Sequence, residues 1–130
     1  MVIIDTSVWI DFFNGSCNEE TIKLEGLKQK KVDIFTTGLI ITEILCGVKD
    51  NEILEELKEK LLKLPFVNPC YPETYINSAL IYRKGRKKRI TIRKTIDFLI
   101  AQLAIENGLY LLHKDNDFNK IATFTKLNIY

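Results

Sequence analysis

The N-terminal segment Val2-Ile3-Ile4-Asp5-Thr6-Ser7 is the clearest indication of how this chain folds. Three consecutive apolar residues predict a short strand that is buried on both faces, as strands of parallel sheets are. The acid and the two hydroxyl residues that follow are types that cap helices, so a helix should begin soon after the strand. The N-terminal segment therefore predicts a strand that leads directly into a helix.

The rest of the chain repeats this alternation. Apolar spacing predicts helices at 8–13, 19–30, 40–48, 53–64, from 73 into a basic stretch, and from the N-cap Thr95 to 107. Short apolar runs predict further strands at 33–37, 66–67, 109–112 and 127–130, and an acidic loop is expected at 113–118. Helices that alternate with short strands predict an α/β fold with a largely parallel sheet between helices.

Composition narrows the class of protein. With 130 residues, of which 46% are hydrophobic and 28% charged, the chain is predicted to form one domain over residues 1–130. The net charge of +2 does not by itself require a nucleic-acid partner. Three cysteines without a C-x-x-C spacing indicate neither a disulfide framework nor a zinc site, and a cytoplasmic location is expected. The sequence shows no signal peptide and no apolar run of membrane-spanning length, so no membrane role is expected.

Acidic residues stand where several of these elements begin or end. Asp5 ends the first strand, Asp115 and Asp117 follow the strand at 109–112, and Glu43 and Asp97 lie early in predicted helices. Ligand sites in open parallel sheets form beyond the carboxyl ends of the strands. These acids are therefore expected to converge on one crevice.

Converging carboxylates repel one another and need protons or a cation to remain together. A hard divalent cation such as Mg²⁺ prefers oxygen ligands and keeps open positions for a phosphate oxygen and a nucleophilic water. The expected chemistry is phosphodiester hydrolysis without a side-chain nucleophile.

Each acid also has an ordinary structural explanation. Asp97 alone could favour a helix dipole, Glu43 could be a solvent-facing helix residue, and the Asp-Asn-Asp sequence at 115–117 could form a plain turn. Asp5 is harder to explain in this way, because an acid that ends a buried strand must be solvated, capping or liganding. Their joint placement favours a functional site.

A stretch rich in arginine and lysine, residues 83–94, lies between Glu43 and Asp97 in the sequence. Its residues could form a solvated helix end, or a track that binds a phosphate backbone without reading sequence. On the second interpretation the phosphate-binding residues are Arg86, Lys87, Lys88, Arg89 and Arg93, and the molecule would be electrically two-sided. Trp9, Phe12 and Phe13 are predicted to pack in the core, and His113 to be a loop residue without a catalytic role.

Four blocks of the sequence together resemble the PIN-domain nucleases, and within them the VapC-type toxins. They are Ile3-Ile4-Asp5-Thr6-Ser7-Val8-Trp9-Ile10, Thr42-Glu43-Ile44-Leu45-Cys46-Gly47, Asp97-Phe98-Leu99-Ile100-Ala101 and Leu111-Leu112-His113-Lys114-Asp115-Asn116-Asp117-Phe118. The blocks occur in the family's order and span nearly the whole chain. This agreement is far more specific than any single motif.

The resemblance implies a three-layer α/β/α sandwich and a Mg²⁺- or Mn²⁺-dependent endoribonuclease acting on structured RNA such as tRNA or rRNA. It assigns metal binding to Asp5, Glu43, Asp97 and Asp115, with Thr6 or Ser7 orienting Asp5 or a water. Asp117 would assist, and the resemblance leaves open whether Asp115 or Asp117 lies closer to the metal. His113 departs from the family, which usually has Thr or Ser there. The resemblance also implies a homodimer and a cognate antitoxin protein that occupies the active-site groove.

Three alternatives remain open at this stage. The chain could be a stand-alone RNA-processing nuclease, a non-catalytic RNA- or protein-binding module, or a phosphotransfer domain with Asp5 as nucleophile. The phosphotransfer reading is weakened because Ser7 occupies the place of a second acid and no paired N-terminal acids precede Asp5.

Overall fold

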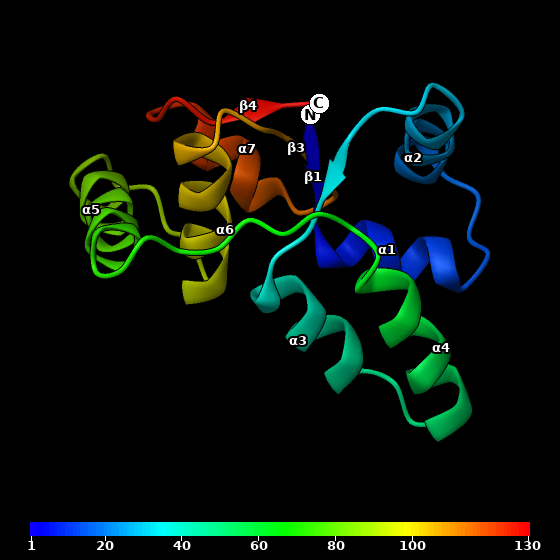
Figure 1. Ribbon diagram of the computed structural model, residues 1–130. Helices are drawn as coiled ribbons and strands as arrows, with labels where there is room; N and C mark the ends of the chain where they lie inside the picture. The colour runs from blue at the N-terminus through cyan, green and yellow to red at the C-terminus, as the bar shows by residue number, and fades with distance from the viewer.

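The computed structural model describes residues 1–130 as seven helices around four short strands (Figure 1). The strands are β1 (Val2–Ile4), β2 (Ile34–Phe35), β3 (Tyr110–Leu112) and β4 (Asn128–Ile129). The helices are α1 (Thr6–Phe13), α2 (Glu19–Gln29), α3 (Gly38–Cys46), α4 (Asn51–Leu61), α5 (Glu73–Lys87), α6 (Thr95–Glu106) and α7 (Asn116–Ala122).

The strands form one parallel sheet in the order β2-β1-β3-β4. In its register Ile3 lies beside Phe35 on one side and Leu111 on the other, so β1 and β3 are the central strands. The predicted parallel sheet is confirmed. The strand expected at 66–67 is reduced to a single bridge between Thr36 and Phe66.

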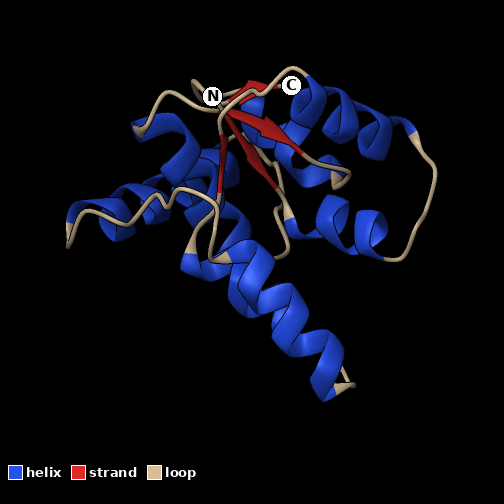
Figure 2. Cartoon of the chain, turned by 45° about the vertical axis from the view of Figure 1, so that its right-hand side comes forward, coloured by secondary structure: helices blue, strands red, loops and turns tan.

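Helices cover both faces of the sheet, as Figure 1 and the view in Figure 2 show. α1 and α2 lie on one side, and α6 lies on the other with α5 packed outside it. α3 and α4 project from the end of the sheet at which β1 and β2 finish. The three-layer α/β/α sandwich expected from the family resemblance is confirmed.

The core runs through both helical layers and the sheet between them. Every residue of β1 is buried, and Leu111 and Leu112 of β3 are equally enclosed. The continuous apolar runs in the sequence therefore reflect strands that have helices on both faces. Trp9 is buried, and Phe12 and Phe13 pack against the core, as predicted.

Two local predictions about the chain were wrong. The N-cap of α6 is Lys94, and Thr95 is the first helical residue. The segment after β3 is not a six-residue loop, because Asp115 caps α7 and Asp117 already lies in its first turn. Asp and Asn favour both turns and helix N-termini, and the sequence pattern did not separate the two.

The three cysteines lie exposed on the surface as free thiols. The longest helix, α5, has 15 residues and carries charges near its end, and none of the helices is both long and apolar enough to span a bilayer.

Candidate active site

All four predicted metal-binding acids line one cavity of about 460 Å³. The cavity lies beyond the carboxyl ends of β1 and β3, where Asp5 follows β1 and Asp115 follows shortly after β3. Glu43 reaches it from α3 and Asp97 from the first turn of α6. The remaining lining residues are Thr6, Ser7, Ile10, Thr42, Cys46 and Lys94.

Asp5 is held in place by the start of α1. It is the N-cap of that helix, and one carboxylate oxygen accepts hydrogen bonds from the backbone N–H (3.1 Å) and hydroxyl of Ser7. The side chain is buried, so these bonds fix its orientation. Ser7 therefore orients Asp5, as one of the two sequence alternatives proposed.

Thr6 has a different partner from the one expected. Its hydroxyl donates a 2.7 Å hydrogen bond to Oε2 of Glu43, across 37 residues of sequence. Glu43 is the sixth residue of α3, two residues further into the helix than predicted, because the helix begins at Gly38 and not at Ile40. The bond ties α1 to α3 and positions the glutamate carboxylate at the cavity.

Asp97 is the most electrostatically unusual group of the site. It is 4% exposed, and its Oδ2 atom has no hydrogen-bond partner. Burial is the largest cause that raises the pKa of Asp97 to about 7, against the opposing charge of Lys94. Nearby carboxylates add to the increase, namely those of Asp5, Asp115 and Glu43.

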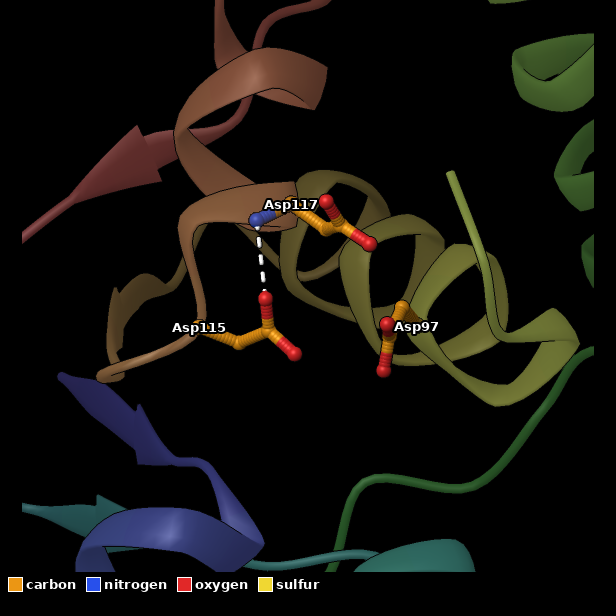
Figure 3. Close-up of side chains that lie close together, drawn as sticks. All are labelled: Asp97, Asp115 and Asp117. Atoms are coloured by element: carbon orange, nitrogen blue, oxygen red, sulfur yellow. Dashed lines mark hydrogen bonds between the residues drawn. The ribbon is translucent and has the colours of Figure 1, made fainter. Parts of the chain in front are cut away.

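Asp97 also belongs to a tighter trio with Asp115 and Asp117 (Figure 3). One carboxylate oxygen from each lies within 4.8 Å of the others. The backbone N–H of Asp117 donates a 3.0 Å bond to Oδ1 of Asp115, which leaves the other oxygen of Asp115 directed into the space beside Asp97.

The carboxylate of Asp117 is bound by two cationic side chains. It accepts hydrogen bonds from Lys120 Nζ (2.6 Å) and from Nε and the backbone N–H of Arg93 (3.1 and 3.2 Å). Burial by itself would raise the pKa of Asp117, but these bonds outweigh it and lower the pKa to about 2. Asp117 is absent from the cavity lining, whereas Asp115 is present.

We expect Asp117→Asn to destabilise the fold by about 1–2 kcal/mol at neutral pH, since Arg93 is largely exposed and Lys120 partly exposed, so that solvent screens both pairs. A carboxylate with a lowered pKa stabilises the folded state above its ordinary pKa near 4. That contribution is lost as the pH falls from about 4 to about 2. Urea unfolding of both proteins at several pH values measures the difference, which should shrink toward acid pH. A constant difference would show that the asparagine disturbs packing instead.

The last two residues of the basic stretch, Arg93 and Lys94, lie beside the acids. The expected separation of positive and negative charge was therefore wrong for these two residues. Arg93 Nη2 lies 3.3 Å from Oδ1 of Asp115, and Lys94 Nζ lies 3.8 Å from its other oxygen. Residues 91–94 lead into α6, which brings these two cations to the cavity rim. The exposed residues Arg86, Lys87, Lys88 and Arg89 lie at and beyond the C-terminal end of α5.

His113 lies in the loop between β3 and α7, as predicted, and its side chain is buried there. It is 8% exposed, its ring lies 5.1 Å from that of Phe118, and neither ring nitrogen has a partner. Burial lowers the pKa of His113, while the charges of Asp5 and Asp115 oppose the shift. The side chain is therefore packed against Phe118, and its lowered pKa favours the neutral form.

Sequence reasoning missed Lys120, which secures Asp117 from one turn further along α7. The spacing of three residues between acid and lysine is the signal for such a pair on a helix. This helical spacing was not recognised, because the start of α7 was predicted to be a loop.

The fold and the cavity together define an α/β protein with a carboxylate centre at the carboxyl ends of a parallel sheet. The family model described as PIN domain matches residues 2–123. The chain belongs to the PIN domain family. The family assignment predicted from the four sequence blocks is confirmed.

Similar proteins include VapC ribonuclease Mb1587 of Mycobacterium bovis and ribonuclease VapC11 of Mycobacterium tuberculosis. Each is 33% identical over 128 residues, which cover 98% of this chain and 96% of the relative. The structure is also similar to a solved structure of VapBC2 from Rickettsia felis bound to a promoter DNA fragment, with a TM-score of 0.79, 20% identity, and coverage of 100% and 98% of the two chains. The solved structure of VapBC-1 from nontypeable Haemophilus influenzae has a TM-score of 0.74 and 18% identity, with coverage of 100% of this chain and 97% of the other. These structural likenesses support the fold.

Proposed function

We propose that this chain is a divalent-metal-dependent endoribonuclease and the toxin of a toxin–antitoxin pair. The observation that carries the proposal is that Asp5, Glu43, Asp97 and Asp115, from four distant segments, line one cavity. The similar proteins from Mycobacterium are named as ribonucleases, which supports RNA as the substrate class. The solved VapBC structures support a partner protein that acts as antitoxin.

The donor set fits a hard divalent cation, Mg²⁺ or Mn²⁺. All candidate ligands are carboxylate oxygens, and the unpartnered, buried Oδ2 of Asp97 lacks the group that would satisfy it. Asp97 and Asp115 would hold the cation together with Asp5 and Glu43, which line the same cavity. The cation would supply Lewis-acid chemistry, polarising a phosphate oxygen and activating water for in-line attack.

The protein's own groups prepare the site for this reaction. Ser7 and Thr6 fix the carboxylates of Asp5 and Glu43, so little reorganisation is needed when substrate binds. Arg93 and Lys94 place positive charge at the rim, where a phosphate backbone would approach. The exposed cations at 86–89 would extend that contact along the RNA.

The direct test is incubation of the purified chain with total RNA and with a tRNA or rRNA fragment. We expect cleavage with Mg²⁺ or Mn²⁺, loss of cleavage when EDTA is added, and products with 5′-phosphate and 3′-hydroxyl ends. RNA binding that persists without any cleavage would instead support a non-catalytic module.

The toxin role is tested separately in cells. Expression of the chain should arrest bacterial growth, and co-expression of its cognate antitoxin, sought as a short reading frame beside its gene, should restore growth. RNA cleavage in vitro without growth arrest would favour a stand-alone RNA-processing enzyme. Light scattering of the purified protein tests the proposed homodimer, and fractionation tests the proposed cytoplasmic location.

A further inference from the structure

A second cavity of about 460 Å³ lies between α5 and α6 and has a different character. Its lining combines aromatic and aliphatic side chains with one arginine, Arg93. Phe98 is buried, and the ring of Tyr82 lies 5.2 Å from it at an interplanar angle of 72°. Tyr75 and Tyr82 are about half exposed, so aromatic surface is available to a ligand. We call this cavity the aromatic groove.

The aromatic groove adjoins the acidic cavity through one turn of helix. Thr95 and Phe98 line the aromatic groove, while Lys94 and Asp97 line the acidic cavity. Neighbouring sides of the first turn of α6 therefore face the two cavities, so the cavities adjoin across a single turn of helix. A single RNA strand could therefore reach both cavities at once.

Arg93 connects the two cavities. It lines the aromatic groove, yet its Nε donates to Asp117 and its Nη2 lies 3.3 Å from Asp115. Asp117 is buried and also bound by Lys120, so it anchors Nε, while Nη2 donates to Asp115 at the boundary between the two cavities. A guanidinium held in this way can bind a phosphate oxygen and stack on a planar ring.

We propose that the aromatic groove binds one unstacked base of the RNA, in the nucleotide next to the phosphate that enters the acidic cavity. This inference rests on the proposed ribonuclease function and adds a substrate-positioning subsite to it. Tyr82 supplies the stacking face, and Arg93 contacts the linking phosphate.

The combination of charge and aromaticity favours a nucleotide over a purely apolar partner segment. Proteins that recognise single-stranded RNA stack bases on aromatic rings and arginine planes, beside cations that follow the backbone. The aromatic groove has both features, and Lys94 adds a second cation where it meets the acidic cavity. An apolar segment of another protein would leave Arg93 without a counterpart beyond its own acids.

The test combines protein variants with a modified substrate. The probe is a labelled RNA hairpin that the wild-type protein cuts at one position in its loop, together with versions in which each flanking nucleotide in turn lacks its base. Tyr82→Ala and the groove-filling Ala79→Leu should each raise the KM for the intact hairpin on the order of tenfold. Tyr82→Phe, which keeps the ring, should restore the wild-type value. Tyr110→Ala, at the amino end of β3, is the matched control and should have no effect.

Removal of one particular flanking base should weaken wild-type cleavage to the same extent and have no further effect in Tyr82→Ala. Independent, additive losses would overturn the proposal. So would conversion of a dimer to a monomer by Ala79→Leu, because the aromatic groove would then be an interface between two copies. Failure of the wild-type protein to cut any RNA with Mg²⁺ or Mn²⁺ would contradict the proposed function itself. In that case, equal binding of the intact and base-deleted hairpins would also overturn the base-binding proposal.

Discussion

Asp97→Asn should reduce the RNA cleavage rate on the order of 100-fold or more while leaving the fold intact. Asparagine has the same shape but no negative charge, so it would lose the attraction that holds a divalent cation between Asp97 and Asp115. The residue is buried with one oxygen unpartnered, so the substitution breaks no hydrogen bond of that oxygen. Single-turnover cleavage at saturating RNA measures the chemical step, and circular dichroism reports the fold.

The matched control for this substitution is Asp33→Asn, which changes an exposed acid outside the cavity and should cleave RNA at the wild-type rate. Asp5→Asn should resemble Asp97→Asn, because both acids line the same cavity. Undiminished Mg²⁺-dependent cleavage by Asp97→Asn and Asp5→Asn would contradict the proposed metal centre. Loss of activity accompanied by unfolding would assign the acids a structural role.

The sheet and its acids were predictable because strand burial and strand endings are local properties of the sequence. Val2 to Ile4 is apolar at every position, as a central parallel strand must be, and Asp5 follows without a spacer. Residues at the carboxyl ends of neighbouring parallel strands necessarily meet at one edge. The convergence of Asp5 and Asp115 therefore followed from topology alone.

The different surroundings of Asp115 and Asp117 could not be predicted in the same way. Both residues follow the same strand, and only the position of α7 decides which carboxylate faces the cavity and which faces Lys120. The pairing of Arg93 with Asp117 spans 24 residues and depends on how the segment before α6 crosses the sheet edge. No local pattern encodes such a contact.

The three helices around the cavity also help to explain how clustered acids are tolerated. Asp5 is the N-cap of α1, Asp115 is the N-cap of α7, and Asp97 lies in the first turn of α6. The N-terminal end of a helix carries partial positive charge and free N–H groups, which favour a nearby carboxylate. This arrangement offsets part of the mutual repulsion and leaves the rest to be neutralised by a proton or a cation.

Asp97 is the group at which a proton and a cation should compete. Its pKa is raised to about 7, whereas an aspartate in the unfolded chain has a pKa near 4. The protonated carboxyl therefore stabilises the folded state below about pH 4, and this contribution is lost as the pH rises toward about 7. Above that range, the metal-free protein contains an ionised, buried and unsatisfied carboxylate, which a divalent cation would neutralise.

Mg²⁺ should therefore raise the free energy of unfolding of the wild-type protein strongly near pH 8 and very little near pH 5.5. In Asp97→Asn the metal-free protein should be about 2–4 kcal/mol more stable than metal-free wild type near pH 8, and the gain should diminish toward pH 5.5. Urea unfolding with EDTA or with Mg²⁺ at both pH values measures all of these differences. Equal stabilisation by Mg²⁺ at the two pH values, in wild type and variant alike, would show that the cation binds elsewhere than at Asp97.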